Sequence, residues 1–197
     1  MITVVGSRNS KFNHLDDIRQ PFYHEDDPNN YYYNEYCGHL YNLEHISDHK
    51  NFIGLEHYRR TFAKDGKPMT EEDINSILKD YDIIVKAKHG PFDKHNNLTV
   101  LSGCSRHRIN YIKDATYTLK KFPNLIEQAK DTTHYGCNMF ITTPDKYKEM
   151  VEEAKFYIDN MLEYCKQQSM ISYFCETIIT PYLITKYNDK IYIGDVI

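Results

Sequence analysis

The segment Asn51–Phe62, which reads NFIGLEHYRRTF, constrains the fold more than any other stretch of the sequence. Its apolar first half suits a buried strand, and its second half carries His57, Tyr58, Arg59 and Arg60 in consecutive positions. A strand that ends in this way delivers cations to the carboxyl edge of a sheet, where open α/β folds bind ligands. Because a guanidinium group donates two hydrogen bonds to adjacent oxygens, the segment predicts a phosphate-binding site. The alternative is an exposed arginine cluster that pairs with nearby carboxylates.

Strand-like and helix-like patterns alternate along the rest of the chain. Short apolar runs that suit strands lie at 2–5, 81–85, 139–141 and 190–197. Helical patterns, with apolar residues mostly three or four positions apart, lie at 34–46, 70–79, 144–166 and 172–184. Thr70 and Thr143 are typical helix starts, because acidic residues follow each of them. The alternation predicts an α/β fold with one mixed central sheet flanked by helices. A chain of 197 residues suits a single domain, predicted to span 1–197.

Two segments near the N-terminus are predicted to be polar. Lys11–Tyr33 is rich in Asp, Asn and His, and we expect the segment His24–Asn34 to form a loop. The helix over 34–46 is predicted to expose one polar face to solvent. This face carries Glu35, His39, Asn42 and His45. Because His39, His45 and His49 do not share one helical face, the spacing argues against a site in which all three bind a metal.

Composition excludes several classes of protein. With a net charge of −4 and no long basic run, the chain lacks the positive surface that general nucleic-acid binding requires. The five cysteines include no CxxC pair, so we expect no disulfide framework, no structural zinc site, and a reducing compartment. The apolar run at the N-terminus is too short for a signal peptide, and nothing transmembrane follows it. These observations predict a cytoplasmic protein without a membrane span.

Gly6 and Ser7 form the first additional candidate site. They follow a short apolar strand at once, which is a frequent beginning of nucleotide-binding α/β domains. The turn contains neither GxGxxG nor GxxxxGK, so an ordinary turn after a core strand is an equal alternative.

Asn138 and Glu176 are the other two candidates. Asn138 stands at the entrance of a strand, where it offers a donor and an acceptor to a hydroxyl-rich ligand or caps a neighbouring turn. Glu176 lies among apolar residues, which suits a catalytic base or a carboxylate paired with Arg59 or Arg60.

Asp80 and Asp82 form a DxD pattern, the metal-binding signature of many sugar-nucleotide transferases. A working DxD stands at the carboxyl end of a strand, whereas these aspartates precede the apolar run. They are therefore weak candidates for a metal site.

The order of these segments resembles a family of bacterial and viral glycosyltransferase-like proteins of capsular and exopolysaccharide biosynthesis, formerly known only as a domain of unknown function. The segments that carry the resemblance are NEYCGHLYNLEHI (34–46), FIGLEHYRRTF (52–62), ILKDYDIIVKA (77–87) and NMFITTPDKYKEMVEEAKFYIDNMLEYC (138–165). They cover most of the chain, and the HYRR and NMF blocks together are specific. Glu176 stands at the place of a family acidic residue.

The resemblance implies a GT-A-like fold and transfer of a sugar from a nucleotide-diphosphate donor to a glycan acceptor, in a bacterial cell or a virus-infected host cell. The site residues that it implies are His57, Tyr58, Arg59, Arg60, Asn138 and Glu176. Two positions depart from the family pattern. Thr177 stands where relatives often have arginine, and HYRR stands where other GT-A enzymes present a DxD. The second departure leaves a requirement for Mn²⁺ or Mg²⁺ open.

These assignments lead to a hypothesis about mechanism. Gly6 and Ser7 would hold the nucleotide of a UDP-sugar, and the HYRR cations would neutralise the diphosphate as the glycosyl bond breaks. Glu176 is the better candidate for a base, and Glu176 or Asn138 would contact sugar or acceptor hydroxyls. The possible ligands of a divalent cation are Glu56, His57, Asp80 and Asp82.

Two other functions fit the same residues. A non-catalytic glycan- or nucleotide-sugar-binding module is favoured by the tyrosine-rich segment Tyr31–Tyr33 and by the missing strand-end DxD. A phosphate-ester hydrolase could use the same arginines, but no nucleophile or metal cluster supports it.

Overall fold

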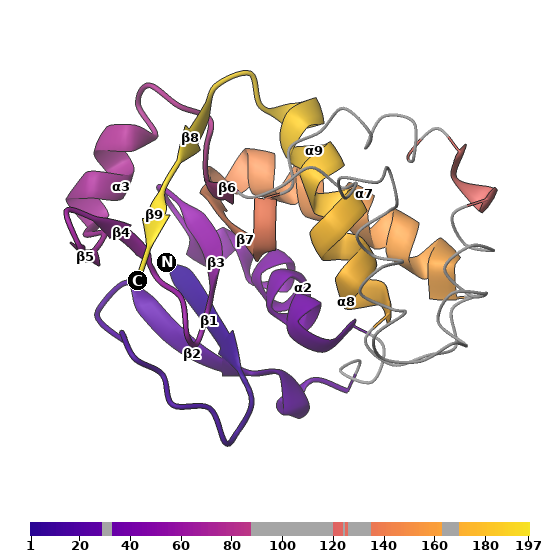
Figure 1. The fold of residues 1–197 in the computed structure, drawn as a ribbon, viewed down its shortest axis with the longest axis horizontal. Coiled ribbons are helices and arrows are strands. Elements are labelled where there is room, and N and C mark those ends of the chain that lie inside the picture. Colours follow the sequence, from indigo (N-terminus) through magenta and orange to yellow (C-terminus); the bar gives the residue numbers. More distant parts are fainter. Residues whose placement is uncertain (29–32, 88–119, 124, 126–134, 163–169) are drawn as a thin grey trace, which may run out of the picture.

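The computed structural model describes residues 1–28, 33–87, 120–123, 125, 135–162 and 170–197 (Figure 1). Within these residues, the central sheet has six strands in the order β2-β1-β3-β7-β6-β8. The strands are β1 (Ile2–Gly6), β2 (Arg19–Tyr23), β3 (Ile53–His57), β6 (Ile83–Ala87), β7 (Tyr135–Thr142) and β8 (Ile191–Ile193). Strands β2, β1 and β3 are parallel, β7 is antiparallel to both β3 and β6, and β8 is parallel to β6. The predicted mixed α/β sheet is confirmed.

Helices cover both faces of this sheet (Figure 1). The helices are η1 (His24–Asp26), η2 (Asn34–Tyr36), α2 (Cys37–Glu44), η3 (Ile46–Asp48), α3 (Glu71–Ile77), α7 (Pro144–Leu162), α8 (Met170–Phe174), the π-helical turn η4 (Cys175–Ile179) and α9 (Thr180–Tyr187). Helices α2, α7, α8 and α9 lie on one face, and α3 lies on the other beside a small sheet. That sheet has the order β5-β4-β9, with β4 (Phe62–Lys64), β5 (Lys67–Pro68) and β9 (Asp195–Val196).

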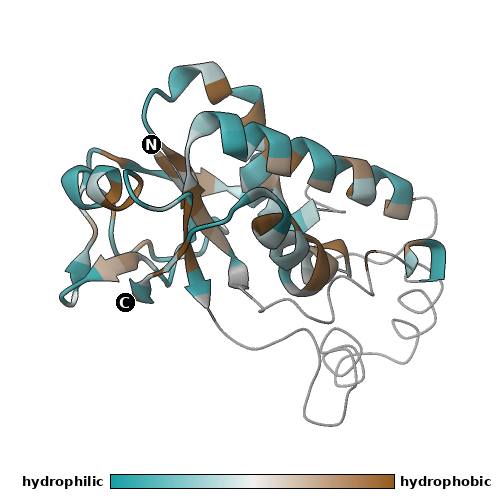
Figure 2. Ribbon diagram, turned by 90° about the horizontal axis from the view of Figure 1, so that it is seen from above, coloured by the Kyte–Doolittle hydropathy of each residue, from teal (hydrophilic) through white to brown (hydrophobic). Residues whose placement is uncertain are grey.

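Alternating side chains of the strands supply two hydrophobic cores. In β6, Ile83 and Val85 pack into the core under α2, α7 and α9, whereas Ile84 packs into the core on the α3 side. Strand β7 alternates in the same way, because Phe140 joins the first core and Met139 and Ile141 join the second. Figure 2 shows these hydrophobic strands between more hydrophilic helices. A strand that is buried on both faces has a continuous run of apolar residues, as 83–85 in β6 and 139–141 in β7 do.

The helix starts follow the sequence prediction. Thr70 caps α3: its hydroxyl accepts from the N–H of Asp73, and the Asp73 carboxylate accepts from the N–H of Thr70. Helix α7 begins at Pro144, directly after Thr143, whose carbonyl accepts from the N–H of Tyr147. Proline suits this first helical position because its missing N–H would have no partner there.

The N-terminal third holds one strand that was not predicted and one prediction that is wrong. The edge strand β2 precedes the predicted loop His24–Asn34, and its Pro21 is tolerated because an edge strand leaves some N–H positions unpaired. The predicted polar face of α2 is misplaced: His39 and Asn42 are buried, whereas Tyr41 is 39% exposed. Helix α2 packs against both the sheet and α7, so two of its sides are covered.

In the part of the chain that the structure describes, no helix is long and apolar enough to cross a membrane. Tyr31 and Tyr32 of the tyrosine-rich segment lie outside the described residues. Tyr33 is 6% exposed, and its hydroxyl donates to Asp159 Oδ1 at 2.8 Å, so this tyrosine belongs to the core rather than to a binding surface.

Candidate functional site

The carboxyl ends of three parallel strands meet at one edge of the sheet. The register places Gly6 of β1 beside Tyr23 of β2, and Val5 of β1 beside His57 of β3. The N–H of Tyr58 donates to the carbonyl of Val5 at 2.9 Å. A Cβ atom at Gly6 would lie 3.0 Å from Cβ of Tyr58, so the close approach of the two segments requires glycine. The structure therefore brings together the two predicted donor-binding segments, Gly6-Ser7 and HYRR.

The HYRR segment forms a tight turn that presents both arginines outward. The N–H of Arg60 donates to the carbonyl of His57 at 2.7 Å and closes the turn. Arg59 is exposed and Arg60 is partly exposed. The guanidinium carbon of Arg59 lies 5.0 Å from the ring centroid of Tyr58, within the range of a cation–π contact. Neither guanidinium forms an ion pair with any residue that the structure describes, which opposes the alternative of arginines neutralised by local carboxylates.

His57 lies beneath this turn and is 3% exposed. Its Nε2 is 2.7 Å from Glu35 Oε1, and its Nδ1 accepts from the N–H of Arg59 at 3.4 Å. Burial would raise the pKa of Glu35, but the hydrogen bond and charge of His57 outweigh it and hold that pKa below its usual value. Because both ring nitrogens have partners within the protein, His57 supports the turn.

An aromatic cluster borders the turn. The ring of Phe12 lies edge-on to Tyr23 at 5.5 Å and to Tyr58 at 6.4 Å between centroids. Ser7 donates its N–H to Ser10 Oγ at 2.8 Å, which fixes the loop after β1. The cluster therefore places flat apolar rings between the Gly6-Ser7 turn and the arginines.

Asn138 enters the same edge from the antiparallel strand β7. The register pairs Leu55 with Phe140, and continuing it places Asn138 across from His57. Asn138 has a φ of 53° and lies where the pairing of β6 and β7 shifts its register, as in a β-bulge. Its side chain is 2% exposed, and its Oδ1 accepts from Thr180 Oγ1 at 3.1 Å. Asn138 therefore ties β7 to α9, and its amide oxygen already has a donor.

A buried hydrogen-bonded chain holds the backbone of Asn138. His39 Nε2 lies 2.7 Å from the carbonyl of Asn138, which can only accept, so this nitrogen carries the proton. His39 Nδ1 then accepts from the hydroxyl of Tyr147 at 2.6 Å. Asn42 donates in turn to the hydroxyl of Tyr147 at 3.0 Å. Sequence reasoning missed this chain, although a tyrosine in the apolar stripe of α7 signals that a buried partner is needed for its hydroxyl.

Burial lowers the pKa of His39 from 6.5 to about 4, and the hydrogen bond to Asn138 only partly offsets this. Between these two pH values the unfolded chain binds a proton that the folded chain excludes. The free energy of unfolding should therefore fall as the pH drops through this window, by about 3 kcal/mol. His39→Gln should be less stable at neutral pH but should lose this pH dependence, in urea titrations at several pH values. His45→Gln, the matched control, should keep the wild-type slope; an unchanged slope in His39→Gln would contradict the assignment.

Glu176 is partly buried on the π-helical turn η4, which packs against β7. π-helical turns inside α-helices are frequent at functional sites. The predicted helix over 172–184 is thus divided into α8, η4 and α9, with Pro181 in the first turn of α9. Glu176 therefore belongs to an element that contacts the strand of Asn138.

The candidate metal ligands are divided between the two edges of the sheet. Glu56 is buried and binds Arg19 and the N–H of Phe62. Asp80 and Asp82 precede β6 and therefore lie at the opposite edge of the sheet from HYRR. Asp82 Oδ2 accepts from two backbone N–H groups of the turn before β8, and Oδ1 pairs with Lys146 at 3.0 Å. Among the described residues, no group of three or more His, Cys, Asp or Glu could hold a metal ion.

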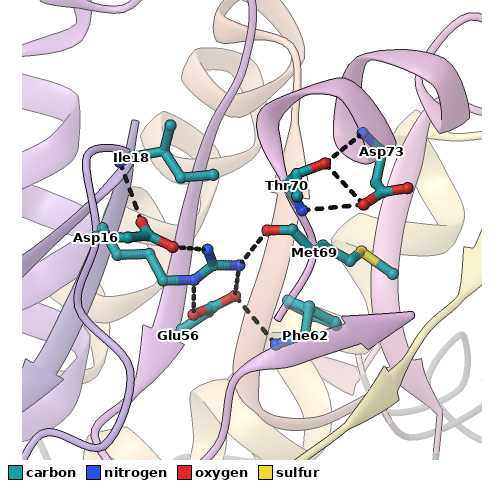
Figure 3. A network of polar contacts seen from close by, with 8 residues as sticks. Asp16, Ile18, Glu56, Phe62, Met69, Thr70 and Asp73 are labelled. Carbon is teal, nitrogen blue, oxygen red and sulfur yellow. Dashed lines mark hydrogen bonds and ion pairs between the residues drawn. The ribbon is translucent and has the colours of Figure 1, made fainter. Parts of the chain in front are cut away.

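Sequence reasoning also missed the buried ion pair between Arg19 and Glu56 (Figure 3). Arg19 Nε lies 2.9 Å from Glu56 Oε2, and both side chains are fully buried. Arg19 also donates to the carbonyl of Met69 at 2.9 Å and to Asp16 Oδ2 at 2.7 Å. Glu56 Oε1 accepts from the N–H of Phe62 at 3.0 Å. Because Glu56 precedes the HYRR turn and Phe62 follows it, this hydrogen-bonded network connects the two ends of the turn.

The fold is similar to that of a known transferase structure. The apo structure of the bifunctional glycosyltransferase WbbM matches 99% of this chain with a TM-score of 0.63 and 15% sequence identity. This chain covers 44% of that chain, so it spans less than half the length of WbbM. Residues 27–187 match the family described as a domain of unknown function, DUF4422, and the chain belongs to that family. No curated protein sequence matches it.

Proposed function

We propose that this chain is a GT-A-type glycosyltransferase domain that moves a sugar from a UDP-sugar to a glycan acceptor. The observation that carries the proposal is the pair of at least partly exposed arginines at the carboxyl edge of the sheet, beside a glycine turn and an aromatic cluster. Arginines that form no ion pair with a described residue suit an anionic ligand. The fold similarity to a glycosyltransferase structure supports a nucleotide diphosphate as that ligand.

Arg59 and Arg60 bind the diphosphate in this proposal. As the bond from the sugar to the phosphate oxygen breaks, its electron pair moves to the departing UDP, whose negative charge increases. Fixed guanidinium groups stabilise this charge more in the transition state than in the bound donor, which accelerates the reaction. The uracil would lie against the rings of Phe12, Tyr23 and Tyr58, since aromatic faces stack on bases.

Glu176 accepts the proton of the acceptor hydroxyl, whose oxygen forms the new bond to the anomeric carbon. A carboxylate that is partly buried beside the sheet edge suits this role as a base. Asn138 acts as a positioning residue: its side chain binds Thr180, and its backbone is held by His39. No step in this scheme requires a divalent cation, and the described residues offer no cluster for one.

Thermal unfolding with UDP and with a panel of UDP-sugars, each with Mn²⁺ and with EDTA, tests the proposal. A ligand that binds the folded chain at a hundredfold excess over its Kd stabilises it by about 2.7 kcal/mol, which raises Tm by roughly 5–10 °C. Measurement of UDP release from the stabilising UDP-sugar then tests turnover. Failure of every nucleotide to raise Tm would reject the proposal. Binding without UDP release, with or without Mn²⁺, would support the alternative of a non-catalytic binding module. The hydrogen bond between the side chains of Asn138 and Thr180 is compatible with this alternative.

A further inference from the structure

A separate pocket of about 230 Å³ lies between the edge strand β2 and helix α2. Buried Thr3 and Asn42 form its inner wall, and the Thr3 hydroxyl donates to Asn42 Oδ1 at 2.5 Å. Gln20 of β2 lines the pocket and is exposed. The pocket is not one of the sites predicted from the sequence, because it combines an edge strand that was not predicted with a helical face that was predicted incorrectly.

A ladder of rings forms one wall of this pocket. The rings of Phe22 and Tyr41 are 4.9 Å apart at an angle of 36°, and those of Tyr41 and His45 are 4.2 Å apart at 32°. All three residues line the pocket. Tyr41 is 39% exposed and offers both an apolar ring edge and a hydroxyl. Amphipathic rings of this kind suit a ligand that has both C–H surfaces and hydroxyl groups.

The polar atoms of the pocket are mainly hydrogen-bond acceptors. His45 Nδ1 lies 2.8 Å from the carbonyl of Tyr41, so it donates, and Nε2 of the neutral ring is left as an acceptor. Asp26 and Asp48 add carboxylate oxygens, and Gln20 adds an amide that both donates and accepts. A ligand that carries several hydroxyl donors complements this set.

Charge narrows the class of ligand further. Among the described residues that line the pocket there is no Lys or Arg; the N-terminal amine of Met1 donates to the carbonyl of Phe52, and burial lowers its pKa to about 6. Asp26 forms an ion pair with Arg8, so Asp48 is the carboxylate that a phosphate or a uronic acid would meet. A divalent cation is also disfavoured, because the His and Asp side chains of the pocket do not form a group that could hold a metal ion, and no such group occurs elsewhere among the described residues.

We propose that this pocket binds one sugar unit of a neutral glycan. Tyr23 lines the pocket and also belongs to the aromatic cluster of the candidate site, so the two sites adjoin along β2. A glycan seated here would run toward the carboxyl edge of the sheet. Its identification as the acceptor chain rests on the proposed transferase function, whereas sugar binding itself does not.

Amide chemical-shift titration of the intact chain with methyl glycosides of neutral hexoses and N-acetylhexosamines tests this proposal. We expect at least one glycoside to shift the resonances of Gln20 and Tyr41. Tyr41→Ala should bind it about tenfold more weakly, which corresponds to 1.4 kcal/mol. Tyr81→Ala is the matched control, because Tyr81 is 40% exposed and does not line the pocket. If Tyr41→Ala unfolds, Gln20→Ala on the edge strand serves as the second variant.

Calorimetric titration of the same variants with UDP separates this proposal from the proposed function. Tyr41→Ala and Gln20→Ala should bind UDP as tightly as the wild type. If UDP binds but no methyl glycoside shifts the pocket resonances, or if both pocket variants bind the glycoside as tightly as the wild type, the pocket proposal is overturned alone. If the glycoside binds at Tyr41 and UDP does not bind, the pocket proposal stands and the transferase function falls.

Discussion

Glu56→Ala is expected to lower the free energy of unfolding by about 3–5 kcal/mol, the typical cost of breaking a buried ion pair from one side. The substitution leaves the fully buried guanidinium of Arg19 without its buried carboxylate partner, and it removes the acceptor of the Phe62 N–H. For a chain of about this size, the loss corresponds to roughly 10 °C or more in Tm. Urea denaturation followed by circular dichroism measures the change.

A double-mutant cycle provides the control for this prediction. Replacing both charges, in Arg19→Met/Glu56→Met, removes the pair without leaving an unpaired buried charge, so the double variant should be more stable than the sum of Arg19→Met and Glu56→Met implies. Lys148 and Glu152 offer an exposed pair, 3.9 Å apart, whose removal should cost no more than about 1 kcal/mol. If Glu56→Ala cost no more than Glu152→Ala, the structural importance of the buried pair would be refuted.

The double variant Arg59→Ala/Arg60→Ala is expected to bind UDP at least about a hundredfold more weakly than the wild type. Each hydrogen bond to a charged group contributes about 1.5–3 kcal/mol, and 1.4 kcal/mol corresponds to a factor of ten in Kd. Stability should change little, because neither guanidinium pairs with a described residue. Isothermal titration calorimetry at two salt concentrations measures the loss, and the affinity of the wild type should itself fall as salt rises.

Two control variants sharpen this test. Arg59→Lys keeps the charge but loses the planar fork, so its affinity should lie between those of the wild type and Arg59→Ala. Lys79→Ala removes an exposed cation just after α3, and it should leave the affinity for UDP unchanged. Equal affinity of the wild type and the double arginine variant would remove the phosphate-binding role on which the proposed function depends.

Local sequence signals predicted the order of strands and helices, and they placed the Gly6-Ser7 turn and the HYRR segment in one site. Thr70 and Thr143 marked helix starts because capping depends on neighbouring residues alone. Gly6 and the HYRR segment could be placed together because each follows a buried strand, and parallel strands end at the same edge. The prediction therefore used only short-range patterns and one rule of sheet topology.

Contacts between distant residues could not be predicted in this way. Arg19 stands in a strand whose sequence, RQPFY, lacks regular alternation of apolar and polar residues, and its partner Glu56 looks like one more polar residue before HYRR. His39 was placed on an exposed helical face because periodicity cannot show that a second helix covers that face. The positive φ of Asn138 depends on the bulge between β6 and β7 and on the hydrogen bond from His39.

The order of the strands along the chain also determines when the carboxyl edge of the sheet is completed during synthesis. Strands β1, β2 and β3 all lie within the first 57 residues and can pair with one another early. Asn138 reaches the edge only when β7 pairs with β3, after a long intervening segment has left the ribosome. Contacts between distant segments form slowly, because the loop that joins them must first close. In a nascent chain, the HYRR turn is therefore synthesised before β7, the strand that completes its surroundings.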